Sequence, residues 1–147
     1  MSFFDAIGIA ASGMSAERTS MDVTSENLAN AQSTNGPGGQ PYQRQEVVLE
    51  QAGGGFGSTL ADAMGSGQAT TPGGVQVAGI VSDPTPDQLV YDPGNPDANK
   101  QGYVKEPNIS PVTEMVNLID ESNSYQSDVT AMQTAKNMFT TTLDVLK

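Results

Sequence analysis

The chain has 147 residues, with 17 acidic side chains against 6 basic ones and a formal net charge of −11. This length fits one domain. So few Lys and Arg exclude a surface that binds nucleic acid or anionic lipid, because both ligands are bound mainly through cationic side chains. The absence of Cys and His removes disulfides, thiolate nucleophiles, Cys/His zinc sites and Ser-His-Asp chemistry.

The first residues carry no recognisable targeting signal. A basic segment followed by a long apolar one is missing, so we expect no cleaved secretory signal. The most apolar window, residues 3–14, is shorter than the roughly 20 residues that span a bilayer, and it contains Asp5. We therefore expect no transmembrane segment, and any export must use an uncleaved terminus.

Glycine and proline divide the chain into three parts. Of the 16 glycines, 14 lie between residues 35 and 111, and so do all 9 prolines. Because these residues interrupt helices, their distribution predicts two terminal helices around an irregular middle. We expect helical segments over residues 1–31 and 111–147, and an extended middle over 32–110 with a Gly-rich linker at about 52–74.

The first helix is predicted to run from about Phe3 to Ala31. Apolar side chains recur along it every seven residues, and small residues lie beside them, where another backbone can come close. The apolar row consists of Ile7, Met14, Met21 and Leu28. The small residues are Ala6, Ala10, Gly13 and Ala16. This pattern predicts a helix that packs closely along one face.

The middle contains two segments with strand composition, at residues 42–50 and 75–81. The Gly-rich residues between them have the composition of a flexible linker, with at most one helical turn near residues 60–64. The stretch 83–97 is dense in proline, which disfavours regular structure and favours an extended path. The middle is therefore predicted to hold short strands without forming a second domain.

The last helix is predicted to begin at Ser110 and Pro111, a capping residue followed by proline at the first helical position. A second seven-residue apolar row runs along this helix, widened by residues one turn away. The row and its flanking residues are Leu118, Tyr125, Val129, Met132, Phe139, Leu143 and Leu146. Such a repeat is typical of a coiled-coil seam, although an ordinary helical-bundle core fits it too. We expect a mainly α fold whose exposed rows are buried by other chains.

Patterns for catalysis and metal binding are weak. Four aspartates that could form the carboxylate pair of a glycosidase each lie beside Pro or Gly, where Asp side chains usually build turns. They are Asp83, Asp87, Asp92 and Asp97. Residues 97–102 begin like a calcium loop, but Gln101 is a poor third ligand and Asn108 stands where a bidentate Glu is needed. We therefore predict turns, and no enzyme, cofactor or metal site.

A specific resemblance covers most of the chain outside about residues 52–72. The segment from Ser25 to Ala31 resembles the signature of the bacterial flagellar rod and hook axial proteins, and the segments 37–44, 91–98 and 102–108 narrow this resemblance to the proximal-rod members. The residues that carry it are Asn27, Leu28, Ala29, Asn30, Tyr42, Tyr91, Pro96, Asp97, Gly102, Tyr103 and Pro107.

The resemblance implies terminal helices that pair as an antiparallel coiled coil and line a hollow tube. It implies a structural subunit of the flagellar basal-body rod, exported uncleaved by the type III apparatus, which crosses the periplasm, transmits motor torque and passes exported subunits. Implied partners are other proximal-rod proteins, the ring and export-gate junction protein, the distal rod protein, and further copies in a helical stack. A needle- or translocator-like subunit of a related type III system and a wall-cleaving enzyme remain as alternatives.

Overall fold

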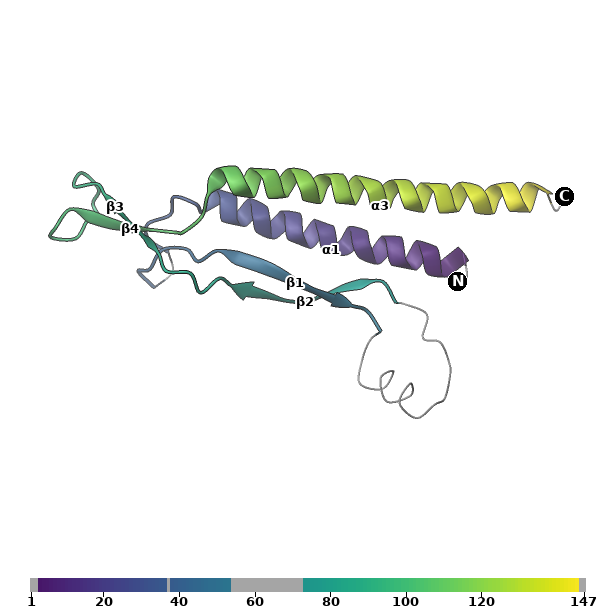
Figure 1. Ribbon diagram of the computed structural model, residues 1–147, viewed down its shortest axis with the longest axis horizontal. Coiled ribbons are helices and arrows are strands. Elements are labelled where there is room, and N and C mark those ends of the chain that lie inside the picture. The colour runs from purple at the N-terminus through teal and green to yellow at the C-terminus, as the bar shows by residue number, and fades with distance from the viewer. Residues whose placement is uncertain (1–2, 37, 54–72, 146–147) are drawn as a thin grey trace, which may run out of the picture.

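The computed structural model describes residues 3–36, 38–53 and 73–145. These residues form helix α1 (Phe3–Ala29), strands β1 (Gln45–Gln51), β2 (Val75–Ser82), β3 (Gln88–Tyr91) and β4 (Tyr103–Glu106), and helix α3 (Pro111–Val145). The molecule is elongated, and α1 lies between α3 and the β1–β2 hairpin (Figure 1). The β3–β4 hairpin projects beyond the end at which α3 begins (Figure 1). The prediction of a mainly α fold with a small strand-containing middle is confirmed.

The two helices lie side by side in opposite directions (Figure 1). A hydrogen bond joins them near the start of α3, where Thr24 Oγ1 donates to Glu121 Oε1 at 2.8 Å. Helix α3 has 35 residues and α1 has 27, so α3 runs past the N-terminal end of α1 (Figure 1). Helix α1 ends two residues before the predicted Ala31, because the bond from the Ala31 N–H to the Leu28 carbonyl tightens the chain into a turn.

Helix α3 begins as the sequence predicted. The Ser110 hydroxyl accepts a hydrogen bond from the Thr113 N–H at 3.4 Å, and the Ser110 carbonyl accepts one from the Glu114 N–H at 3.0 Å. Pro111 occupies the first helical position, where its missing N–H needs no partner. The helix start is therefore fixed by local chemistry that the sequence already contains.

The predicted strands form an antiparallel pair, β1 and β2, with Gln45 opposite Ser82 and Gln51 opposite Val75. The register shifts between Val48 and Leu49, and such a bulge increases the local twist. The expected helical turn near residues 60–64 and most of the Gly-rich linker lie outside the described residues.

The sequence analysis missed strands β3 and β4, which pair antiparallel from Gln88–Glu106 to Tyr91–Tyr103. Prolines were expected to prevent regular structure here, but they flank β3 and leave its four residues free to pair. The turn between the strands is held by side chains, as predicted for its Asp and Asn residues. Asp92, Asn95 and Asn99 each accept a hydrogen bond from a backbone N–H two residues further along.

The apolar core of the described residues is small and built mainly from short side chains. Its buried members are Ala10, Ala16, Val23, Ala31, Val104 and Ile109. The largest fully buried side chains are Val104 and two polar ones, Asn27 and Glu114, each 1–2% exposed. Long helices owe most of their stability to packing. Within the single chain, however, many large apolar side chains of α3 stay exposed to solvent.

Candidate functional site: the helix seam and the polar joint

The predicted seam residues differ along the length of the helix pair. On α1, Ile7, Met14, Met21 and Leu28 are all half-buried. On α3, the half-buried members are Leu118, Tyr125, Val129 and Met132. Phe139 and Leu143, beyond them, are 37% and 47% exposed. Leu146 lies outside the described residues. Burial of the α3 row therefore declines toward the end where α3 runs past α1.

Part of the predicted row lines a groove between the helices. Met21, Leu118 and Tyr125 meet there with Ile119, and the groove has a volume of about 650 Å³. Arg18 and Asp22 border it from α1. The structure thus brings members of the two predicted rows together on one surface.

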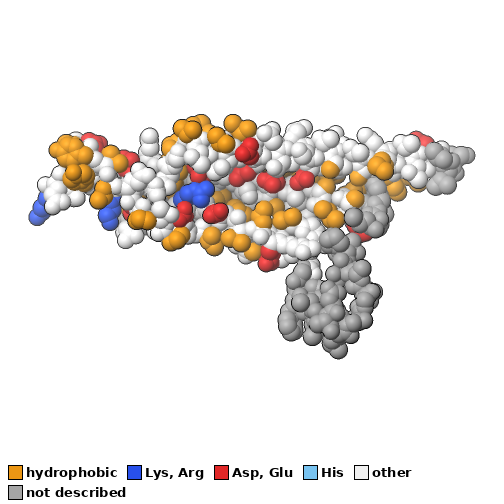
Figure 2. All heavy atoms as spheres, viewed as in Figure 1, with side chains coloured by type: hydrophobic (Ala, Val, Ile, Leu, Met, Phe, Trp, Pro, Cys, Tyr) orange, Lys and Arg blue, Asp and Glu red, His pale blue; other side chains and the backbone are white. Residues whose placement is uncertain are grey.

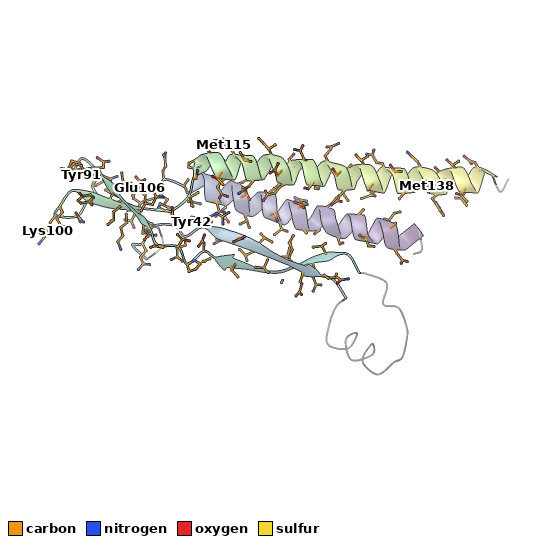
Figure 3. All side chains as sticks on the ribbon, in the orientation of Figure 1. Tyr42, Tyr91, Lys100, Glu106, Met115 and Met138 are labelled. Atoms are coloured by element: carbon orange, nitrogen blue, oxygen red, sulfur yellow. The ribbon has the colours of Figure 1, made fainter. Side chains whose placement is uncertain are left out.

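An apolar stripe that the sequence analysis missed continues outward from this groove along the first turns of α3. Its members are Val112, Met115, Val116 and Ile119, which are 46–68% exposed. Figure 2 shows apolar side chains gathered over this part of α3, and Figure 3 shows Met115 on the side of α3 away from α1. Their spacing of three and four residues places them on one helix face and was the signal available in the sequence.

Carboxylates accompany the apolar row on the hairpin side of the seam. Glu114, Glu121 and Asp128 are seven residues apart on α3. Burial raises the pKa of Glu121, and the charges of Glu17 and Glu114 raise it further, while the bond from Thr24 opposes the shift. Burial also raises the pKa of Glu17, and the charge of Asp128 adds to this effect. Ionisation of Glu17 and Glu121 therefore weakens the packing of α1 against α3.

A polar joint ties the start of β1 to α1 through Asn27. The Asn27 Nδ2 donates to the Gln45 carbonyl at 2.8 Å, and Oδ1 accepts from the Gln45 N–H at 2.9 Å. The side chain thus pairs with Gln45 as a neighbouring strand would. The Tyr42 hydroxyl also donates to Asn27 Oδ1, at 3.1 Å. Burial, aided by the charges of Glu26 and Glu114, raises the pKa of the Tyr42 hydroxyl.

Arg44, which directly precedes Gln45, ties the same joint to α3. Its Nε donates to Glu114 Oε1 at 2.8 Å, and Glu114 is only 2% exposed. Arg44 Nη1 lies 3.8 Å from Glu46 Oε2 and 4.0 Å from Asp83 Oδ2. The hydrogen bond to Glu114 raises the pKa of the Arg44 guanidinium, against the opposing effect of burial. Glu114 Oε2 is buried and makes no hydrogen bond within the described part of the chain.

The remaining motif residues lie mainly in the β3–β4 hairpin. The Tyr91 and Tyr103 rings pack edge to face with centroids 5.2 Å apart, and Tyr91 and Lys100 lie at the tip (Figure 3). A Cβ at Gly102, where φ is +82°, would meet the Tyr91 ring at 2.9 Å. Asp97 accepts a hydrogen bond from Thr34 Oγ1 at 2.8 Å.

The last four motif residues are Ala29, Asn30, Pro96 and Pro107. Pro107 is buried, Ala29 and Pro96 are exposed, and Asn30 Nδ2 donates to the Glu26 carbonyl at 2.9 Å. The described stretches contain no group of acidic residues able to hold a metal ion. None of their helices combines the length and apolarity that crossing a membrane requires.

Comparison with known proteins gives flagellar basal-body rod families at both ends of the chain. Residues 7–37 match the family described as flagella basal body rod protein, and residues 100–145 match the flagellar basal body rod FlgEFG protein C-terminal family. The flagellar basal-body rod protein FlgC of Yersinia enterocolitica is 43% identical over 143 residues, which cover 97% of each chain. The chain belongs to the FlgC family.

Other FlgC proteins match along their whole length. That of Bacillus subtilis is 41% identical over 151 residues, covering all of both chains, and that of Borreliella burgdorferi is 35% identical over 154 residues, covering 100% of this chain and 99% of its own. The resemblance to flagellar axial proteins and the assignment to the flagellar basal-body rod are therefore confirmed. The two segments that match the rod-protein families include Asn27 and Glu114, which lie at the two ends of the polar joint.

Proposed function

We propose that the chain is a structural subunit of the proximal rod, which polymerises with other axial proteins into a hollow shaft that transmits torque and passes exported subunits. The observation that carries this proposal is the apolar stripe on α3, because an elongated helix pair with a thin core needs neighbours to cover such a surface. Helices α1 and α3 act as an antiparallel coiled coil, and the three-part division at about residues 31 and 110 separates them from the extended middle.

The partners that we propose are other proximal-rod proteins, the ring and export-gate junction protein, the distal rod protein, and further copies of this chain. Contacts of this kind join different patches on successive subunits, so they form an open helical stack and not a closed ring. Export without cleavage by the type III apparatus belongs to the same proposal. We also propose that the chain has no catalytic activity, since Asp83 and Glu114 are already engaged by Thr85 and Arg44.

Substitution of Ile119, which is 60% exposed on the stripe, tests the function. Ile119→Asp adds a charge to a surface that assembly desolvates, so we expect normal synthesis and export but no rod growth, hook or filament. The control is Ser124→Asp, an exposed polar position on the same helix that the 3.6-residue repeat places on a different face from the stripe. A map of basal bodies isolated with the unmodified chain should locate it in the proximal rod. Normal rods with Ile119→Asp would contradict the proposed use of this surface.

A further inference from the structure

The β1–β2 hairpin is attached to α1 at both of its ends. Near the start of β1, Asn27 holds both backbone groups of Gln45. At the other end of the hairpin, the Val75 N–H donates to Ser12 Oγ at 3.0 Å. Two points define an axis, and here both lie on α1. These contacts alone therefore fix the position of the hairpin along α1 but leave it free to swing around that helix.

The Arg44–Glu114 pair supplies a third attachment that lies off this axis, because Glu114 belongs to α3. In the described structure α1 separates α3 from the hairpin (Figure 1), so this pair reaches across from one side of the joint to the other. Three points that do not lie on one line fix an orientation. The pair therefore removes the swing that the contacts with α1 permit.

The chemistry of the pair makes its geometry hard to exchange. Glu114 is almost fully buried, so its carboxylate cannot replace the guanidinium with bulk water without opening the joint. The same guanidinium lies near Glu46 of β1 and near Asp83, which directly follows β2. The Asp83 N–H also donates to the Arg44 carbonyl at 2.8 Å. A swing of the hairpin would pull Arg44 away from at least one of these groups.

We propose that Arg44 and Glu114 are positioning residues, which lock the β1–β2 hairpin at one angle to the helix pair and so present it to a neighbouring subunit. This role rests on the proposed function for its consequence in assembly, but the lock itself belongs to the free subunit. A purely stabilising pair could be replaced by apolar side chains of similar size, often without loss of stability. A lock could not, because apolar contacts lack the direction of the hydrogen bond.

The test is the double variant Arg44→Met/Glu114→Leu, which removes both charges together and leaves no buried ion unpaired. The chain has no native cysteine, so spin labels at Ile80→Cys on β2 and Gln126→Cys on α3 report the hairpin angle as a distance distribution. Without the double substitution, the labelled chain should give one narrow peak. The double variant should give a distribution at least twice as wide, with unchanged helical circular dichroism and a several-fold loss of assembled rods.

The matched control is Glu50→Leu/Gln76→Met, which removes an exposed hydrogen-bonded pair inside the hairpin that does not reach α3. It should leave the distance distribution narrow. A broad distribution before the double substitution, an unchanged one after it, or a loss of helix in the double variant would each overturn the lock and leave the proposed function standing. A wider distance distribution in the double variant together with normal rod assembly would show that the fixed hairpin angle is not needed to present the hairpin to a neighbouring subunit. Absence of the unmodified chain from the rod would instead reject the proposed function.

Discussion

The two ends of the helix pair differ in how they are fixed. At the end where α3 begins, Asn27, Glu114, Val104 and Ile109 are buried, and polar side chains connect segments that are far apart in sequence. At the other end, Met138 is 65% exposed, and Phe139 and Leu143 keep more than a third of their surfaces open to solvent. At the first end, long-range contacts within one chain fix the joint, while the apolar stripe on the first turns of α3 stays exposed. At the second end, the last described residues of the α3 row are themselves exposed. Both surfaces are left for a neighbour to cover.

This difference shows that order in the subunit does not follow from helix propensity alone. Both ends are helical, yet buried side chains concentrate at the end where long-range pairs meet. Helices without such packing are only marginally stable in water. The polar joint should therefore dominate the stability of the free chain, while the apolar stripe and the exposed far end of α3, the open end, should dominate its behaviour in assembly.

Breaking the joint at one partner should have the largest effect on stability. Arg44→Met leaves the buried Glu114 carboxylate without its guanidinium, and removal of one partner of a buried ion pair costs about 3–5 kcal/mol. Urea unfolding of the free chain should reveal this loss. Asp120→Asn, an exposed change on the same helix, should shift the midpoint by less than about 0.5 kcal/mol. Equal midpoints for Arg44→Met and the parent chain would show that the joint does not dominate.

Removal of the Asn27 side chain should have a somewhat smaller effect. Asn27→Ala leaves the Gln45 N–H and carbonyl and the Tyr42 hydroxyl without their partner, and we expect a loss of about 2–3 kcal/mol. The same urea titration measures it. Asn30→Ala is the control, because within the described residues the Asn30 side chain bonds to the Glu26 carbonyl, one turn earlier in the chain. A similar loss for both variants would mean that the clamp on Gln45 contributes nothing specific.

A substitution at the open end, where Phe139 lies, should affect the stability of the free chain little and rod assembly strongly. Phe139→Asp affects a side chain that is 37% exposed, so the free chain should lose only about 1 kcal/mol. Rod growth should nevertheless stop at this subunit, because assembly would bury the new carboxylate. Electron microscopy of basal bodies and a swimming assay measure the outcome, with the exposed Asp144→Ala as the mild control. Swimming cells with Phe139→Asp would show that this end is not an assembly surface.

The smallest effect should come from pH, acting along the seam between the two ends. The pKa values of Glu17 and Glu121 are raised above 4.5, so their contribution to stability is complete below pH 4.5 and is lost as the pH rises through the folded-state values. Asp83, whose pKa is lowered from 3.8 mainly by hydrogen bonds from Thr85, opposes this only at more acidic pH. The melting temperature should therefore rise as the pH is lowered from 7 to 5.

Glu121→Gln should reduce this dependence, since the amide does not ionise. Circular dichroism at the two pH values measures it, and the Thr24 hydrogen bond to Glu121 can persist with the amide oxygen as acceptor. A melting temperature that falls toward pH 5 would contradict the sign derived from burial of the carboxylates.

The sequence predicted the features that depend on local signals. Both helices, the Ser110–Pro111 start and the strands β1 and β2 follow from capping, periodicity and composition within short windows. The motif residue Asn27 was found only through the family resemblance, which gave no hint of its bonds with Gln45.

Features that depend on distant contacts were missed. Arg44 and Glu114 are 70 residues apart in the chain, and nothing in either local sequence indicates that they pair. Strands β3 and β4 escaped prediction because each has only four residues and proline-rich turns surround them. The sequence predicted the turn that Asp92, Asn95 and Asn99 stabilise, but not that this turn brings the two short strands together.

The unequal lengths of the helices give the subunit a direction. The difference between 35 residues in α3 and 27 in α1 corresponds to about 12 Å at 1.5 Å per residue. A neighbour that covers the protruding end of α3 must supply a recess of matching depth, and the joint end, closed by the β3–β4 hairpin, has a different shape (Figure 1). A copy inserted in the reverse orientation would leave the protruding end of α3 without a matching recess. Each folded chain thus carries a direction along its long axis that a rod built from it can inherit.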